Sequence, residues 1–242
     1  MMIDFHAHLK RDPIEKVYDT DDLLADMDAN DIDVRLVSAL EGKSISAQNN
    51  AVVELARAHK GRLLACAVID PKQDDCIGEA KRVAAIDEVR ALEFNSWEHG
   101  YLPERYAHHL DPIFDIAAKA GLPVKLFAGW GARSMPHQWA QYAKKHPDVT
   151  FVVLHIGGID FGYGSIDLVR STPNMMFETS AQTELQVLRK AFKDISPDRF
   201  LFGSNYPEHF TRISIDTFDV LNLPEATRKA MFSENAAKLL GL

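Results

Sequence analysis

Two histidines near the start of the chain, His6 and His8, are separated by a single residue. Residues two apart in a β-strand point to the same face, so both imidazoles could reach one ion. A hydrogen-bonded histidine pair inside the fold is the alternative. A third imidazole, His155, follows the apolar run Phe151 to Leu154 and would lose most of its hydration there. It would act either as a general base or ligand or as a hydrogen-bonded core histidine.

One acidic and one basic residue could complete such a site. Glu93 would add a carboxylate to His6 and His8, giving the two-histidine, one-carboxylate set that zinc accepts. Alternatively, Glu93 pairs with a cation such as Arg90 or Lys125. Lys125 could neutralise Glu93, or it could place an ammonium where an ion would lie and create a metal-free site for a carboxylate.

Other side chains could contact a substrate. We interpret the segment Ser96 to Leu110, which is rich in aromatic residues and histidines, as a loop over the mouth of the site, with Trp97 facing a substrate. Arg133 is the preferred candidate for holding a substrate carboxylate, because a guanidinium offers forked donors. A surface arginine is the alternative. Glu178 is a further acidic candidate, for which a salt bridge is the simpler interpretation.

The elements that must position these residues are short apolar runs that alternate with amphipathic segments. This pattern indicates repeated βα units around a parallel sheet. The predicted strands are Ile3 to Ala7, Val34 to Ala39, Leu63 to Ile69, Val89 to Asn95, Pro123 to Ala128, Thr150 to Ile156, Met175 to Thr179 and Phe200 to Ser204. The predicted helices include Asp21 to Ala29, Asn49 to His59, Ile77 to Ala85, Pro112 to Ala120, Met135 to His146, Leu185 to Lys193 and Arg228 to Leu240.

Eight such units predict an α/β fold, a (β/α)8 TIM barrel, as one domain over residues 1–242, with an open doubly wound sheet as the alternative. Polar residues favour the barrel, because they gather at or just beyond the carboxyl ends of the predicted strands, where barrel enzymes keep their active sites. These residues are His6, His8, Glu93, Asn95, His155, Ser180 and Asn205.

Several motifs resemble the amidohydrolase superfamily, in particular the amidohydrolase-related branch that includes aminocarboxymuconate-semialdehyde decarboxylase. They occur in family order along nearly the whole chain, as Ile3-Asp4-Phe5-His6-Ala7-His8, Gly121-Leu122-Pro123-Val124, Val153-Leu154-His155-Ile156-Gly157-Gly158, Leu201-Phe202-Gly203-Ser204-Asn205-Tyr206-Pro207 and Asn235-Ala236-Ala237-Lys238-Leu239-Leu240-Gly241. The resemblance implies a divalent ion, commonly zinc, bound by the first two histidines, a histidine ending the fifth strand and an aspartate ending the eighth. It also implies that His155 orients or deprotonates water.

The sequence departs from that pattern at two positions. Phe127 stands at the fifth-strand position and supplies no lone pair, whereas Asn205 stands at the eighth and offers only a neutral carbonyl oxygen. Asn205 cannot take a proton from bound water, so the usual metal-hydroxide mechanism lacks its base.

Three hypotheses about function follow. The first is a metal-dependent hydrolase or a non-oxidative decarboxylase (a lyase) of a small carboxylic acid or amide, with His155 and Asn205 as catalytic residues and a zinc ion on His6, His8 and Glu93. The second is a metal-free barrel that binds a small acidic ligand or uses only acid–base residues. The third is a structural or regulatory subunit, with Phe127 and its neighbours filling the pocket.

The composition and charge of the chain argue against some classes of binding partner. A formal net charge of -8 argues against binding to nucleic acid or an anionic membrane. The start of the chain lacks the pattern of a signal peptide, and no apolar run is long enough to cross a bilayer. The 2 cysteines, Cys66 and Cys76, suggest neither a disulfide scaffold nor a structural zinc site. We therefore expect a cytoplasmic protein that acts on a small molecule and forms a homodimer, as is common in this group.

Overall fold

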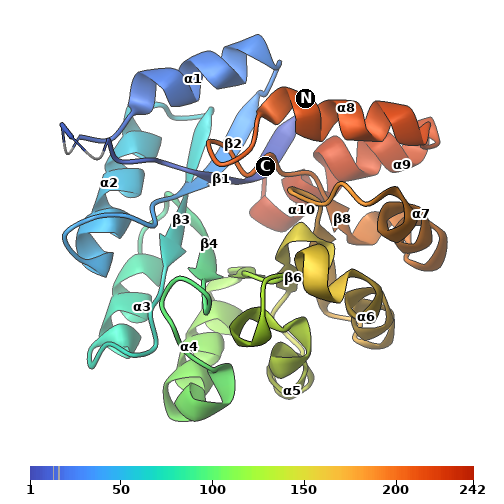
Figure 1. Cartoon of the computed structure of the whole chain (residues 1–242). Coiled ribbons are helices and arrows are strands. Elements are labelled where there is room, and N and C mark those ends of the chain that lie inside the picture. Colours follow the sequence, from blue (N-terminus) through green and yellow to red (C-terminus); the bar gives the residue numbers. More distant parts are fainter. Residues whose placement is uncertain (13, 16) are drawn as a thin grey trace.

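Eight parallel strands form one sheet in chain order in the computed structural model, which describes residues 1–12, 14–15 and 17–242 (Figure 1). The strands are β1 (Ile3–His8), β2 (Val34–Ser38), β3 (Leu63–Val68), β4 (Val89–Phe94), β5 (Val124–Leu126), β6 (Phe151–Val153), β7 (Met175–Glu178) and β8 (Phe200–Leu201). Backbone hydrogen bonds join β1 to the segment around β8, including Phe5 N to Phe202 O at 2.8 Å and His8 N to Tyr206 O at 2.7 Å. The sheet therefore closes into the predicted (β/α)8 barrel, and the open-sheet alternative is wrong.

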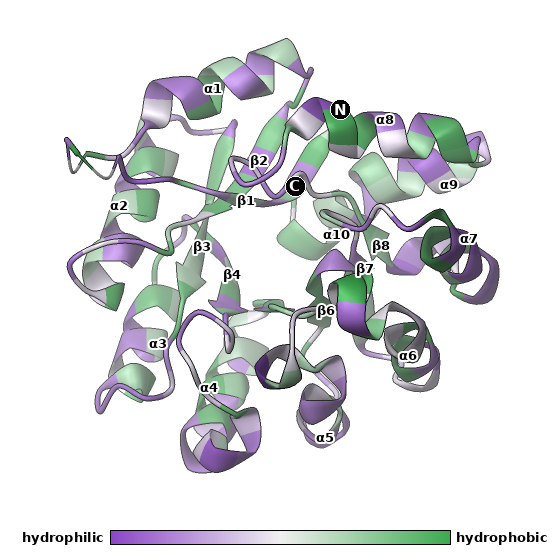
Figure 2. Cartoon of the chain, in the orientation of Figure 1, coloured by the Kyte–Doolittle hydropathy of each residue, from purple (hydrophilic) through white to green (hydrophobic). Residues whose placement is uncertain are grey.

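Helices surround the barrel and connect its strands (Figure 1). They are α1 (Thr20–Ala29), α2 (Ile45–Ala58), α3 (Cys76–Ala84), α4 (Ala107–Ala120), α5 (Ala140–Lys145), α6 (Gly158–Ser171), α7 (Leu185–Asp194), α8 (Thr211–Leu221), α9 (Glu225–Lys229) and α10 (Asn235–Leu240). Figure 2 shows apolar residues along the strands and mixed polarity on the helices, as amphipathic packing requires.

The buried apolar residues form two clusters. The larger includes Leu92, Phe94, Phe114 and Phe151, and it joins the barrel to surrounding helices. The smaller combines strand residues such as Phe5 and Leu36 with Ala236 and Leu240 of α10. The last helix therefore packs against barrel residues and contributes to the core.

The segment after β4 differs from its prediction. We expected a loop over residues Ser96 to Leu110, but a 3-10 turn occupies Pro103–Tyr106 and α4 begins at Ala107, so that Pro112 lies inside that helix. The Tyr142 hydroxyl of α5 donates to the Pro103 carbonyl at 2.8 Å and holds this segment against α5. Only the first few residues after β4, including Trp97, remain at the mouth of the barrel.

The predicted helix Met135 to His146 is broken, because 3-10 turns at Ala132–Ser134 and Pro136–Trp139 precede the short α5. The helices predicted from the sequence did not include α6 and α8. In α6, Gly158, Gly162 and Gly164 lower the intrinsic helix propensity and obscured its pattern.

The predicted sixth strand, Thr150 to Ile156, is too long. β6 ends at Val153, and a 3-10 turn over Leu154–Gly157 follows, in which His155 has a φ of 60° and Ile156 a φ of 50°. His155 is therefore positioned by a turn in left-handed backbone conformation and not by a strand.

Within the described part of the chain, none of the helices is both long enough and apolar enough to cross a membrane.

Candidate active site

A β-bulge positions the two histidines of β1. The register with β2 pairs Asp4 with Arg35 and Ala7 with Val37, so Phe5 and His6 together face a single residue, Leu36. The His6 and His8 rings have centroids 4.7 Å apart, and the ring of His155 lies 5.2 Å from that of His6. The fold therefore brings together the three imidazoles that the sequence indicated.

A serine fixes the orientation of His8. The Ser38 hydroxyl of β2 donates to Glu93 Oε2 at 2.8 Å, and His8 Nδ1 lies 2.9 Å from the same hydroxyl oxygen. Because the hydroxyl proton is used on the carboxylate, His8 Nδ1 is the donor in the second bond. His8 Nε2 is thereby left with a free lone pair, which is the form that binds a metal or accepts a proton.

A second serine does the same for His155. Its Nδ1 lies 2.9 Å from the Ser180 hydroxyl and 3.2 Å from the Ser180 carbonyl oxygen. A carbonyl only accepts, so Nδ1 carries the proton and Nε2 carries the lone pair. The Ser180 hydroxyl in turn donates to Glu178 Oε2 at 2.9 Å, and the same carboxylate oxygen accepts from the His155 backbone N–H at 3.1 Å. This last bond stabilises the left-handed turn.

The two chains of hydrogen bonds, His8–Ser38–Glu93 and His155–Ser180–Glu178, thus have the same arrangement. Sequence reasoning missed the role of Ser38 and placed Ser180 only among the polar residues at strand ends. Ser38 stands at the end of a short apolar run, which was the available signal. Its partners belong to other strands and could not be read from that run.

Glu93 pairs with Lys125, one of the two alternatives that the sequence left open. Lys125 Nζ of β5 lies 2.9 Å from Glu93 Oε2, and both side chains are fully buried. Burial alone would raise the pKa of Glu93, but the Lys125 ammonium, His8 and the hydrogen bond from Ser38 lower it to about 2. Burial alone would lower the pKa of Lys125, yet the Glu93 carboxylate beside it raises the pKa. Glu93 is therefore a carboxylate, and Lys125 an ammonium, at neutral pH.

The histidines are neutral for a related reason. Burial lowers the pKa of His155 to about 3, and burial with the charge of Lys125 lowers the pKa of His6 well below its ordinary value.

Glu178 forms no salt bridge with a lysine or arginine among the described residues. Burial raises its pKa to about 7, although the hydrogen bonds from Ser180 and His155 oppose that shift. The salt bridge expected for Glu178 is reduced to a 3.8 Å contact between Oε2 and Nδ1 of His155, whose ring is neutral, so the main partners of Glu178 are hydrogen-bond donors.

The donor set fits a divalent ion. In the described part of the chain, two groups have ligand atoms within 4.8 Å of one another: His6 with His8 and Glu93, and His6 with His155 and Glu178. Both ring nitrogens of His6, Nε2 of His155 and Oε1 of Glu93 are buried without a hydrogen-bond partner. Both oxygens of Glu178 already accept hydrogen bonds. Glu93 is therefore the better carboxylate ligand, with Lys125 as a competing cation.

The two positions that depart from the superfamily pattern also border the site. The Phe127 ring, just beyond β5, lies 5.4 Å from the His155 ring and stacks on Trp130 at 5.3 Å. The Asn205 backbone N–H donates to the His6 carbonyl at 2.8 Å, and its side-chain amide lies beside the His6 ring. Phe127 and Asn205 therefore border the site, as the motifs in the sequence predicted.

A pocket of about 280 Å³ opens from these residues to the surface. Trp97 and Phe127 line it, together with His8 and Asn205, and the Lys10–Glu208 ion pair at 3.2 Å lies at its edge. Arg133 does not line it. Its guanidinium stacks over the Trp97 ring at 4.8 Å and its side chain is exposed. The expected carboxylate-holding role of Arg133 has no direct geometric basis here, whereas Trp97 does form part of the wall.

Comparisons with known proteins agree with this architecture. The sequence matches the amidohydrolase family over residues 3–242. The chain therefore belongs to the amidohydrolase family, as its motifs predicted. No curated protein matches it.

Three similar solved structures illustrate the fold. A 5-carboxyvanillate decarboxylase from Sphingomonas paucimobilis has a TM-score of 0.80 at 14% identity, covering 100% of this chain and 99% of that chain. The 5-carboxyvanillate decarboxylase from Novosphingobium aromaticivorans, complexed with manganese and 4-hydroxy-3-methoxy-5-nitrobenzoic acid, has a TM-score of 0.79 at 14% identity, covering 100% and 96%. A probable 2-pyrone-4,6-dicarboxylic acid hydrolase from Acinetobacter baumannii, with citric acid bound, has a TM-score of 0.76 at 14% identity, covering 100% and 99%.

Proposed function

We propose that this amidohydrolase is a divalent-metal-dependent decarboxylase of a small carboxylic acid that carries a single ring. The observation that carries the proposal is the pair of histidine–serine–glutamate chains. They hold Nε2 of His8 and Nε2 of His155 as acceptors on either side of the unpartnered His6 ring. Such fixed tautomers are typical of metal ligands and general bases.

His6, His8 and Glu93 would hold the ion. Bound there, it would polarise the substrate carboxylate and offset negative charge that develops during the reaction. Manganese in one of the similar structures supports a divalent ion, and Mn²⁺ is therefore a better first choice than zinc. The surrounding residues favour a small flat substrate, because the pocket of about 280 Å³ has aromatic walls at Trp97 and Phe127. Arg133 would position Trp97 by stacking on its outer face.

Decarboxylation suits these residues better than hydrolysis. In the superfamily pattern the eighth-strand aspartate is the base for the attacking water, and Asn205 cannot take that role. Decarboxylation breaks the bond between the substrate carbon and its carboxylate, leaves the electron pair on that carbon and releases CO₂. That carbon must then take up one proton from solvent water, which His155 Nε2 would relay, and the hydroxide left behind combines with the released CO₂ to give bicarbonate.

The test uses the full chain, depleted with a chelator and reloaded with Mn²⁺. A panel of hydroxybenzoic acids would be followed by NMR in D₂O for loss of the carboxylate and appearance of one ring deuterium. We expect turnover only with metal, a loss of at least about 100-fold in His155→Gln, and no metal binding in His6→Ala. Lys193→Gln, an exposed change on α7, is the matched control.

Two outcomes would contradict the proposal. If the chain binds Mn²⁺ but opens a lactone ring and releases no CO₂, it is a hydrolase. If chelator-treated protein and His6→Ala both retain full activity, the site works without a metal, and the buried cation beside Glu93 is the ammonium of Lys125.

A further inference from the structure

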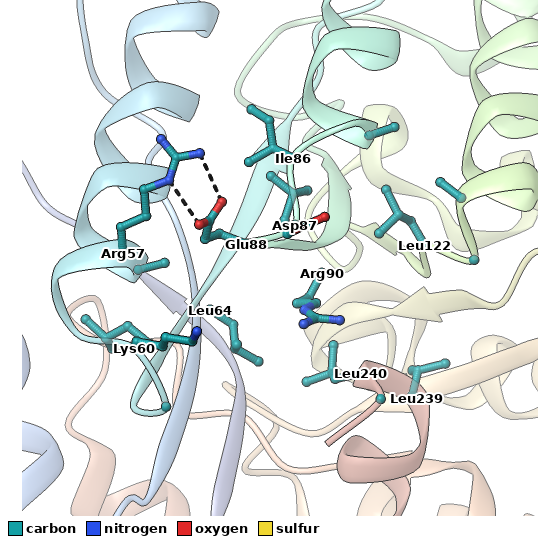
Figure 3. Close-up of a pocket in the computed structure, with 18 of the residues that line it drawn as sticks. Arg57, Lys60, Leu64, Ile86, Asp87, Glu88, Arg90, Leu122, Leu239 and Leu240 are labelled. Atoms are coloured by element: carbon teal, nitrogen blue, oxygen red, sulfur yellow. Dashed lines mark hydrogen bonds and ion pairs between the residues drawn. The ribbon is translucent and has the colours of Figure 1, made fainter.

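A second cavity, of about 720 Å³, lies at the opposite end of the barrel from the histidines. It is lined by the first residues of β3 and β4 and by residues at or just beyond the C-terminal ends of α2, α3, α4 and α10, including Leu64, Leu122 and Leu240 (Figure 3). These positions are at the amino ends of the strands, whereas the candidate active site is at their carboxyl ends. The cavity is therefore separate from the proposed metal centre.

Arg90 is the distinctive residue of this cavity. The register between β3 and β4 pairs Ala65 with Val89 and Cys66 with Ala91, so Arg90 is the extra residue of a β-bulge. Bulges redirect a side chain, and this one places an arginine in the cavity wall. Its Nε is buried without a hydrogen-bond partner, and no ion pair to Arg90 is found among the described residues.

The other charges around the cavity leave a positive excess. Arg57 pairs with Glu88 at 3.0 Å, and Figure 3 shows that pair turned away from the guanidinium of Arg90. Lys60 and Lys238 add two more cations, and Asp87 is the second acid. This excess contrasts with the net charge of -8 on the whole chain.

Helix ends explain some of these cations. Arg57 lies in the last turn of α2 and Lys238 in the last turn of α10, where a positive charge complements the helix dipole. Arg90 belongs to a strand, so the helix dipole does not explain its presence in the cavity wall. A buried guanidinium nitrogen without a partner calls for an acceptor, and a bound anion would supply one.

We propose that this cavity binds a small organic anion, with a carboxylate or phosphate group on Arg90 and Lys60 and an apolar body against Leu64, Leu122 and Leu240. A planar guanidinium suits both anions because it can donate two parallel hydrogen bonds. The volume of about 720 Å³ accommodates a ligand of ordinary metabolite size.

The test uses metal-free full-length protein with labelled arginine Nε–H groups and leucine methyl groups. Phenyl phosphate and benzoate are the probes, and benzyl alcohol is the neutral control. We expect both anions to shift the Arg90 Nε–H signal and the Leu240 methyl signals saturably, and the alcohol to leave the Arg90 signal in place. In Arg90→Gln, the affinity read from Leu240 should fall at least about tenfold.

Matched variants separate the cavity from general charge effects. Arg189→Gln removes an exposed arginine on α7, across the barrel, and should leave the affinity unchanged. Lys60→Gln, at an exposed site, should weaken phenyl phosphate binding and keeps the test valid if Arg90→Gln does not fold. Benzoate bound at the active site would instead shift the NMR signal of the Trp97 indole N–H.

The proposal is overturned if Leu240 does not respond at probe concentrations of about 10 mM, or if Arg90→Gln binds as tightly as the parent. Equal affinity for benzyl alcohol would also overturn it. Because no metal or turnover is involved, these outcomes are independent of the proposed decarboxylase activity.

Discussion

Lys125 determines how much negative charge Glu93 can offer to an ion. Its ammonium lies 2.9 Å from the carboxylate, and both groups are fully buried, so the pair is weakly screened. A divalent ion on Glu93 Oε1 must therefore bind against a nearby positive charge. Lys125 is fully buried and does not line the pocket of about 280 Å³, so the direct contact with a substrate expected from the sequence has no geometric basis.

Lys125→Gln should strengthen Mn²⁺ binding by about tenfold, because it removes this repulsion while an amide can still donate to Glu93. Equilibrium titration with Mn²⁺ by calorimetry would measure it. Lys119→Gln, an exposed change at the end of α4, is the control. An unchanged or weaker affinity in Lys125→Gln would show that Glu93 does not bind the ion.

The double variant Phe127→His with Asn205→Asp should create a tighter site, because it adds an imidazole and a carboxylate beside the existing donors. Phe127 lies against His155 and Asn205 beside His6, so each new group would stand next to one of the three imidazoles. We expect Mn²⁺ affinity to rise by at least about 10-fold, because even the partners that only orient metal ligands change affinity by about 10- to 100-fold. Elemental analysis after dialysis would record it, and a double variant that retains no metal would refute the inferred geometry.

At the scale of elements, a buried ion-pair network connects the start of the barrel to its outer helices. Arg35 of β2 donates to Asp4 of β1 at 2.8 Å and to Asp26 of α1 at 2.7 Å, and it contacts Thr211 of α8 at 3.2 Å. Asp4 also accepts from the Ser204 backbone N–H at 2.9 Å. This network therefore links β1, which carries His6 and His8, to the segment that carries Asn205.

Arg35→Met should destabilise the fold by about 3–5 kcal/mol, because it leaves Asp4 buried without its cation. Urea unfolding followed by circular dichroism would measure the change. Arg62→Met, which breaks an exposed pair with Asp28, should cost less than about 1 kcal/mol. If the two variants lose similar stability, the Arg35 network does not hold these elements together.

At the scale of the whole molecule, the ligands are held by the barrel itself, so the metal-free protein should remain folded. Hydrogen bonds from Ser38, Ser180 and the backbone orient the site without an ion. Metal binding then adds stability by mass action and is not required for folding.

Mn²⁺ at about 100 times its dissociation constant should add about 2.7 kcal/mol to the unfolding free energy. For a chain of 242 residues this corresponds to a rise in Tm of roughly 5–10 °C. Calorimetry with and without chelator would measure the shift, and His6→Ala should abolish it. A metal-free protein that is unfolded at room temperature would contradict this expectation.

The sequence by itself determined the barrel, the family and the two histidines of β1. Alternating apolar runs and helical periods are local patterns, and His6 and His8, two apart in an extended segment, point the same way. The motifs also located Phe127 and Asn205 correctly.

Only the tertiary structure decided which partners those residues meet. The serine between His8 and Glu93, the pairing of Lys125 with Glu93 and the left-handed turn at His155 all depend on the stagger between strands. The bulges at His6 and Arg90 also depend on how neighbouring strands pair, because a one-residue shift in register changes which side chains face each other. Local periodicity does not encode that register, so the barrel could be predicted and the proton arrangement of its site could not.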